Sequence, residues 1–259
     1  MKTPLIGLLT LALLGCDTED QSSTRLSQNE IRSFLLETNI ETDSPIRYTS
    51  HPSVPNINKT SVRFDISQTI PIYFVSSDGD DPHPTIKDAF TDIERTIERP
   101  TFTSWNLVSH DLTEFRDDTN PNENKPNGTF PTSDFYDTHG IQYGIVVATN
   151  TAPQISPTHG TSLCNTMSIY PYHDTAQIKY DENTNYYTQD NILWINLGNS
   201  KCVVSKEDIK HYVAQALGLY KPLATYFNPW SYGAEQLLFN LYLNEAGMHP
   251  DDMLIAYNE

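Results

Sequence analysis

A segment near the C-terminal end has the residue spacing of a metal-binding helix. It reads IKHYVAQALGLYK and runs from Ile209 to Lys221. Residues four apart on a helix point the same way, so His211 and Gln215 would present their side chains to one point. Two histidines at this spacing hold a zinc ion, a glutamate after the first activates the bound water, and a later glycine allows a sharp turn. Hydrolytic metal chemistry is therefore the first hypothesis to weigh.

The complete pattern for such a site is H-E-x-x-H-x-x-G-x-x-H, the signature of metzincin proteases. Its five fixed positions fall on His211, Tyr212, Gln215, Gly218 and Lys221. Only the first histidine and the glycine match. The helix therefore resembles a degenerate metzincin motif, and the other reading, a coincidental histidine on a helix with an apolar end, stays open.

The surroundings of the motif resemble the matrixin-type branch of the metzincins. The filler ALGL (216–219) is common there, and the segment ILWINLG (192–198) resembles the strand that leads into the active-site helix. The upstream order of strand, amphipathic helix and sheet is similar as well, so the resemblance covers about residues 61–245. It implies an α+β, zincin-like fold: a mixed β-sheet, an amphipathic helix, a central helix that carries the motif, and a C-terminal helix.

The departures from the motif fall where the chemistry would occur. Tyr212 has no carboxylate, and a phenol with an ordinary pKa of about 10 cannot take a proton from water near neutral pH. Gln215 offers an amide oxygen, which is a poor zinc ligand, and Lys221 would bring a positive charge to the ion. The family also has a methionine in a turn beneath the metal, whereas residues 222–230 contain none. We therefore expect no catalytic residue and no cofactor, with His211 as a vestigial metal ligand.

Helix and strand signals predict the elements that would position this site. Capping boxes at Ser205–Asp208 and Thr85–Asp88 begin two helices, the first of which carries the motif. A last helix is expected over GAEQLLFNLYLNEAG (233–247). Alternating or continuous apolar runs predict strands at VRFDI (62–66), PIYFVS (71–76), YGIVVAT (143–149), MSIYPY (167–172) and ILWINLG (192–198).

The N-terminal region predicts export and a lipid anchor. Residues 1–15, MKTPLIGLLTLALLG, have one charge and a short apolar run, as in a signal peptide. LLGC, ending at Cys16, resembles the bacterial lipobox, in which the cysteine is acylated; an ordinary signal peptide is the alternative. Residues 16–60 are predicted as a polar tether with one short helix, capped by Ser27 and Glu30, that docks on the domain or on a partner. Residues 61–259 form the domain.

Charge and cysteine content narrow the classes of partner. The 259 residues have a formal net charge of −17, which argues against nucleic acid and anionic lipid headgroups as electrostatic partners. Membrane attachment would come from acyl chains on Cys16 alone. In an exported chain Cys164 and Cys202 predict one disulfide, with two buried thiols as the alternative.

Three functions remain open from the sequence. The first is a lipid-anchored protein of the bacterial cell envelope whose degenerate domain binds a peptide or protein partner without hydrolysing it. The second is an active zinc endopeptidase with a non-standard site, in which histidines such as His159 or His173 join His211. The third is a structural envelope lipoprotein unrelated to proteases. Zinc is expected only for the second function.

Overall fold

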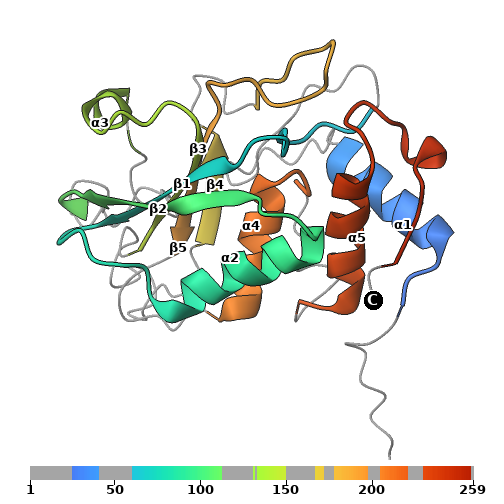
Figure 1. Cartoon of the computed structure of the whole chain (residues 1–259), viewed down its shortest axis with the longest axis horizontal. Helices are drawn as coiled ribbons and strands as arrows, with labels where there is room; N and C mark the ends of the chain where they lie inside the picture. The colour runs from blue at the N-terminus through green and yellow to red at the C-terminus, as the bar shows by residue number, and fades with distance from the viewer. Residues whose placement is uncertain are drawn as a thin grey trace, which may run out of the picture.

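The structure, a computed structural model, describes most of the chain after its N-terminal region. The described residues are 25–40, 60–112, 131, 133–149, 167–171, 178–197, 205–220 and 230–257, with the backbone alone for 167–171. Helices cover both faces of a central sheet (Figure 1). Within the described residues no helix is long and apolar enough to cross a membrane.

The sheet is mixed, with its strands in the order β2-β1-β3-β5-β4 over the described residues. Their bounds are β1 Ile70–Ser76, β2 Phe102–Ser109, β3 Gly144–Ala148, β4 Met167–Pro171 and β5 Ile192–Leu197. Strand β1 is parallel to β2 and β3, and β3 is parallel to β5, while β4 runs antiparallel to β5. This mixed α/β fold agrees with the predicted α+β class.

Alternation along the strands divides the core between the two faces of the sheet. In β5, Leu193, Ile195 and Leu197 enter the larger core, whereas Ile192 and Trp194 enter the smaller one. The same period of two holds in β1 and β3, because successive strand side chains point to opposite faces. Both faces of the central strands are therefore buried, which explains their almost continuous apolar sequences.

Most of the helices pack on one face of the sheet. Figure 1 shows α2 (Pro84–Ile97), α4 (Lys206–Ala216) and α5 (Tyr232–Leu243) together there, and α3 (Ser133–Thr138) apart from them. Helix α2 contacts both α4 and α5, and its inner residues belong to the larger core. Phe135 and Tyr136 of α3 belong to the smaller core on the opposite face. The motif-bearing helix thus lies centrally, between α2 and the β4–β5 edge of the sheet.

The predicted short helix docks on the domain. Helix α1 (Gln28–Leu35) has the expected capping box, with Ser27 Oγ accepting from Glu30 N–H, and it continues as a π-helical turn over Leu36–Ile40. Ile31 and Leu35 are fully buried in the larger core, and α1 contacts α5. This segment of the predicted 16–60 tether is therefore packed into the same core as the residues from 60 onward.

Several local predictions were wrong for identifiable reasons. Residues 62–66 form only an isolated bridge at Arg63, because Val62 and Phe64 are buried by tertiary packing without a strand partner. Helix α2 is capped by the ring of His83, with proline at the first helical position, not by Thr85. Strand β2 and helix α3 were missed, because β2 is an edge strand with several exposed polar residues and α3 is only six residues long.

Candidate functional site

Helix α4 follows β5 and begins at the predicted cap. Ser205 Oγ accepts from the backbone N–H of Asp208 at 3.0 Å and also donates to its carboxylate at 2.6 Å. Acidic residues in the first turn complement the positive end of the helix dipole. Lys206 forms an ion pair with Asp92 of α2 at 2.8 Å. The start of the motif-bearing helix is therefore fixed both by its cap and by its neighbour.

His211 and Gln215 lie on one face of α4, as their spacing predicted. Both are buried, with 4% and 3% of their surface exposed. The ring of His211 packs edge-on against Trp230, with 5.1 Å between ring centroids and 73° between ring planes. Gln215 Oε1 is a buried oxygen without a hydrogen-bond partner among the described residues. The second ligand position thus holds a neutral amide inside the protein.

Tyr212, at the position that the metzincin pattern assigns to the general base, stays protonated. Its side chain packs against the larger core. Burial and, to a lesser extent, the negative charge of Asp208 together raise the pKa of Tyr212 to about 12. The phenol is therefore neutral throughout the physiological range, and it cannot activate water by accepting a proton.

Gly218 turns the chain sharply at the end of α4. The N–H of Gly218 donates to Gln215 O at 3.1 Å and that of Leu219 donates to Ala214 O at 3.0 Å, which is the Schellman pattern. The φ angle of Gly218 is 119°, in the region that side chains rarely adopt. Leu219 and Tyr220 then return into the core, where the Tyr220 hydroxyl bonds to Val62 O and to the Tyr187 hydroxyl.

The side chain of Asn39, in the N-terminal segment, holds this turn in place through hydrogen bonds. Its Nδ2 donates to Gly218 O at 2.6 Å and to Val62 O at 2.9 Å, and its Oδ1 accepts from Val62 N–H at 3.2 Å. The side chain is almost fully buried, with 1% exposed. A side-chain amide can make up to four hydrogen bonds, and that of Asn39 makes three, so this residue is held firmly. The turn after α4 is consequently fixed by side-chain hydrogen bonds inside the protein.

An ammonium group paired with a carboxylate lies beside His211. Lys210 is 7% exposed, and its ammonium is 3.7 Å from Glu235 Oε1 and 5.4 Å from the centre of the Trp230 ring. The Trp230 indole N–H donates to the same carboxylate oxygen at 3.0 Å. The Trp230 ring therefore contacts both His211 and the ion pair of Lys210 and Glu235.

Several predicted site residues lie outside the described residues. These are Lys221, the lipid-anchor residue Cys16, the predicted disulfide pair Cys164 and Cys202, and the histidines His159 and His173. The predicted site residues that the structure does describe are His211, Tyr212, Gln215 and Gly218, which lie on α4 and in the turn that follows it. In the part of the chain that it describes, no group of three or more His, Cys, Asp or Glu residues could hold a metal ion. Comparison with known proteins adds no relative, since no family model, curated protein or solved structure matches the chain.

Residues that the sequence did not single out complete this region. Trp230 was considered only as part of a segment without methionine, and Asn39 lay in the predicted tether. The available signal was the residue type alone, because tryptophan buries a large apolar area and its N–H usually finds a hydrogen-bond partner when it is buried. Nothing in the sequence around Asn39 indicates that it reaches Gly218, because the contact spans 179 positions.

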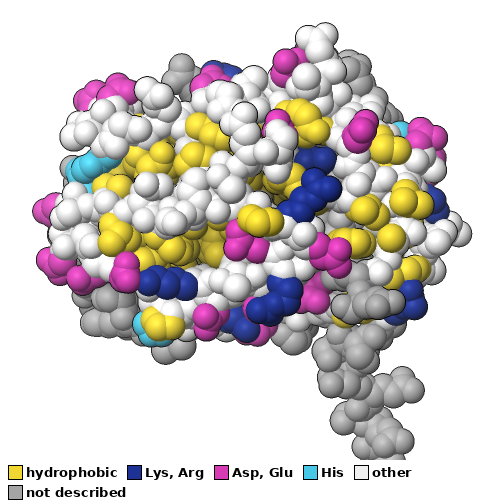
Figure 2. All heavy atoms as spheres, in the orientation of Figure 1, with side chains coloured by type: hydrophobic (Ala, Val, Ile, Leu, Met, Phe, Trp, Pro, Cys, Tyr) yellow, Lys and Arg dark blue, Asp and Glu magenta, His cyan; other side chains and the backbone are white. Residues whose placement is uncertain are grey.

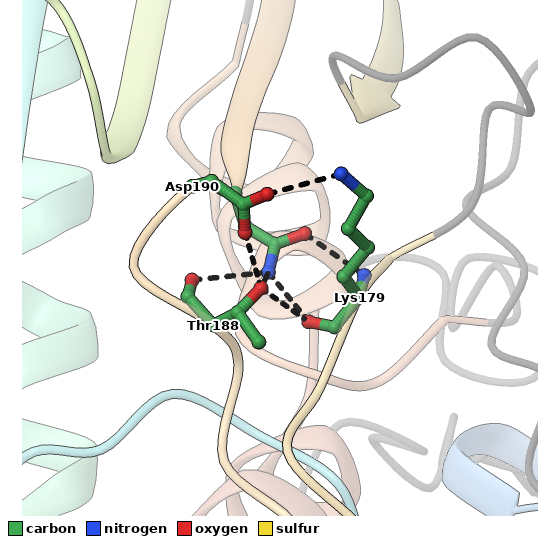
Figure 3. A network of polar contacts seen from close by, with 4 residues as sticks. Lys179, Thr188 and Asp190 are labelled. Carbon is green, nitrogen blue, oxygen red and sulfur yellow. Dashed lines mark hydrogen bonds and ion pairs between the residues drawn. The ribbon is translucent and has the colours of Figure 1, made fainter.

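A hollow lined by both polar and apolar side chains lies elsewhere, near the amino ends of β3 and β5. Its volume is about 440 Å³, and its lining includes Ile141, Lys179, Asp190 and Ile192. Figure 3 shows the network beside it: Lys179 pairs with Asp190 at 3.0 Å, and Thr188 also bonds to that carboxylate. Asn191 joins the two chain segments by accepting from Lys179 N–H and donating to Lys179 O. These charges are satisfied by each other, so the network fixes the loop that leads into β5.

Proposed function

We propose that this chain is a lipid-anchored cell-envelope protein whose metzincin-like domain binds an extended peptide or protein segment without hydrolysing it. One observation carries the proposal: α4 and its glycine turn keep the layout of a zinc-binding helix, with a buried amide at the second ligand position and a protonated phenol at the base position. Anchoring through Cys16 is part of the proposal and rests on the lipobox resemblance.

The arrangement of elements supports the metzincin relation. A mixed sheet, an amphipathic helix α2, a central helix α4 directly after β5 and a C-terminal helix α5 are the parts that the motif's resemblance implied. The chain also turns sharply at Gly218. The ring of Trp230 packs against His211, from the segment in which the family carries a methionine. An aromatic ring in place of a thioether is consistent with a site rebuilt for packing.

Strand β4 is the surface where we place the partner. It is the edge strand beside α4, and within the described residues it pairs with β5 alone. An edge strand has unpaired backbone N–H and C=O groups along its outer side, so an extended segment can add to the sheet there without any metal. The net charge of −17 favours basic over acidic segments.

Binding without cleavage can be tested with a peptide library. We expect the full chain to retain fluorescein-labelled extended nonapeptides, basic ones more tightly than acidic ones, and to return them intact by mass spectrometry. Successive residues of a strand direct their N–H groups to opposite neighbours. Ser168→Pro and Ile169→Pro should therefore differ. The variant that removes the outward N–H should abolish binding in a folded protein, whereas the variant that removes the N–H facing β5 should weaken that pairing and destabilise the fold. Chelator-sensitive cleavage would refute the proposal in favour of an active peptidase.

The metzincin relation itself has a gain-of-function test. The variant Tyr212→Glu/Gln215→His/Lys221→His supplies the missing base and ligands. If α4 and the turn direct these positions to one point, the folded variant should take up about one zinc ion per chain at this site. Adding His211→Ala to the variant should remove that ion, and Tyr212→Gln/Gln215→Ala/Lys221→Ala is the matched control. A folded variant that binds no zinc through His211 would refute the relation.

A further inference from the structure

Two imidazole rings meet at the surface where β2 and α3 end. The Nδ1 atom of His110 lies 3.1 Å from the Nε2 atom of His139, with the rings nearly perpendicular at 85°. Both residues are half-buried. Figure 2 shows histidine side chains at the left margin of the molecule, the side on which β2 ends in Figure 1. No spacing signal links the two histidines in the sequence, because they are 29 positions apart.

The pair is held in place by the core beneath it. Phe135 packs against both rings, with 4.8 Å between its ring centre and that of each histidine. Phe135 is itself buried and packs edge-on against Trp194 of β5. The backbone N–H of His110 donates to Ser76 O at 3.0 Å, and that of His139 donates to Phe135 O at 3.2 Å. Both imidazoles are therefore positioned before any ligand arrives.

The spacing of the two nitrogens matches a pair of ligands on one metal ion. Imidazole nitrogens lie about 2.0–2.1 Å from a transition metal, so two of them are roughly 3.3 Å apart on a tetrahedral ion and roughly 2.9 Å apart on a square-planar one. The observed 3.1 Å lies between these values. We propose that His110 and His139 form a surface site for a divalent transition metal of the imidazole-binding class, Cu²⁺, Ni²⁺ or Zn²⁺, with water completing its coordination.

The protonation of the pair suits this role. A neutral imidazole offers a lone pair on one ring nitrogen and carries its hydrogen on the other. Without metal, one of the two facing nitrogens donates its hydrogen to the other. When the metal binds, that hydrogen moves to the far nitrogen of the same ring, so that both facing nitrogens have a lone pair to donate to the ion. The exchange needs no oxidant or reductant.

The surrounding charge also favours a cation. Asp111 directly follows His110, and Asp137 lies two residues before His139; both are exposed. Neither residue of the pair can join His211, because Phe135 places the pair on the face of the sheet that holds the smaller core, whereas α4 packs in the larger one. The proposed metal site is therefore separate from the degenerate motif.

Titration of the tag-free full chain with CuCl₂, NiCl₂ and ZnCl₂, followed by calorimetry, tests the site directly. We expect one equivalent of at least one ion to bind, with affinity reduced at least tenfold in His110→Gln and in His139→Gln. His83→Gln and His249→Gln, which alter the histidines that cap α2 and the short 3₁₀ helix Pro250–Asp252, are the matched controls and should bind as the wild type does. Circular dichroism establishes that each variant is folded.

A second measurement covers variants that fail to fold. Electron paramagnetic resonance of the Cu²⁺-loaded wild type should show two nitrogen ligands. The proposal is overturned if the spectrum shows none or one, or if folded His110→Gln and His139→Gln proteins bind metal like the wild type. It is equally overturned if His159→Gln or His173→Gln abolishes the binding while the His110 and His139 variants retain it.

Discussion

Two regions of this protein contain histidine in positions that suggest a metal, and they differ in almost every physical respect. On α4, the spacing of His211, Gln215 and Gly218 follows a ligand pattern, yet the side chains are buried against tryptophan and beside a lysine ammonium. At the end of β2, no pattern exists in the sequence, yet two imidazole nitrogens face each other at 3.1 Å near solvent. Spacing on a helix identifies where ligands would be, but only the neighbouring groups decide whether an ion can enter.

The difference also separates structural from chemical roles. The α4 region is tied to the rest of the core through Asn39, Tyr220 and Tyr242, whose hydroxyl donates to Leu217 O at 2.8 Å. Substitutions there should change stability. The His110–His139 pair lies half-buried at the surface, so substitutions there should change metal binding more than stability.

Gly218→Ala should give the largest loss of stability. Its φ of 119° disfavours any Cβ, and that Cβ would lie 3.2 Å from Asn39 Nδ2, Leu241 Cδ2 and Val62 O. Backbone strain and overpacking together should lower the free energy of unfolding by about 3 kcal/mol. Gly140→Ala is the control, since its φ of 64° carries strain alone with nothing within 4 Å; it should lose about 1 kcal/mol. Equal losses in urea unfolding would mean that the α4 turn is not tightly packed.

Saturation with metal should stabilise the protein through the histidine pair and not through α4. At a free metal concentration a hundredfold above Kd, the free energy of unfolding should rise by about 2.7 kcal/mol. The rise should disappear in His139→Gln and persist in His211→Phe, which keeps an aromatic ring against Trp230. Thermal unfolding with and without the ion measures both. Loss of the rise in His211→Phe alone would reverse the contrast between the two regions.

Asn39→Ala should have the next largest effect. It removes three hydrogen bonds and leaves Gly218 O and the Val62 peptide groups buried with fewer partners. We expect a loss of about 2 kcal/mol in urea unfolding. Asn106→Ala removes a single side-chain bond to Ile72 O from an exposed strand position and should cost less than about 1 kcal/mol. A similar cost for both would show that the N-terminal segment contributes little to the turn.

The sequence predicted most of this fold where one local signal was enough. The Ser205 cap, the α4 spacing, the glycine turn and the apolar strands β1, β3, β4 and β5 each depend on residues within one element. Strand β2 was missed because its polar edge residues break the alternation, and residues 62–66 were overpredicted because burial by distant segments resembles a strand pattern. Contacts such as Asn39 with Gly218 and His110 with His139 arise from tertiary packing, which periodicity does not encode.

The smallest predicted effect distinguishes the two regions by pH. Burial raises the pKa of Tyr212 to about 12, above its value of about 10 in the unfolded chain, so its contribution to stability is present below pH 10 and is lost as the pH rises through 12. Between pH 8 and pH 11, the free energy of unfolding of Tyr212→Phe should therefore fall by about 1 kcal/mol less than that of the wild type. The pKa of His139 is lowered, so its contribution is present above about pH 6.5 and is lost as the pH falls through the folded-state value. His139→Gln should flatten only the acid limb of the stability profile and Tyr212→Phe only the alkaline limb, as measured by urea unfolding across pH; a change in the opposite limb would mean that the two regions are coupled through the sheet.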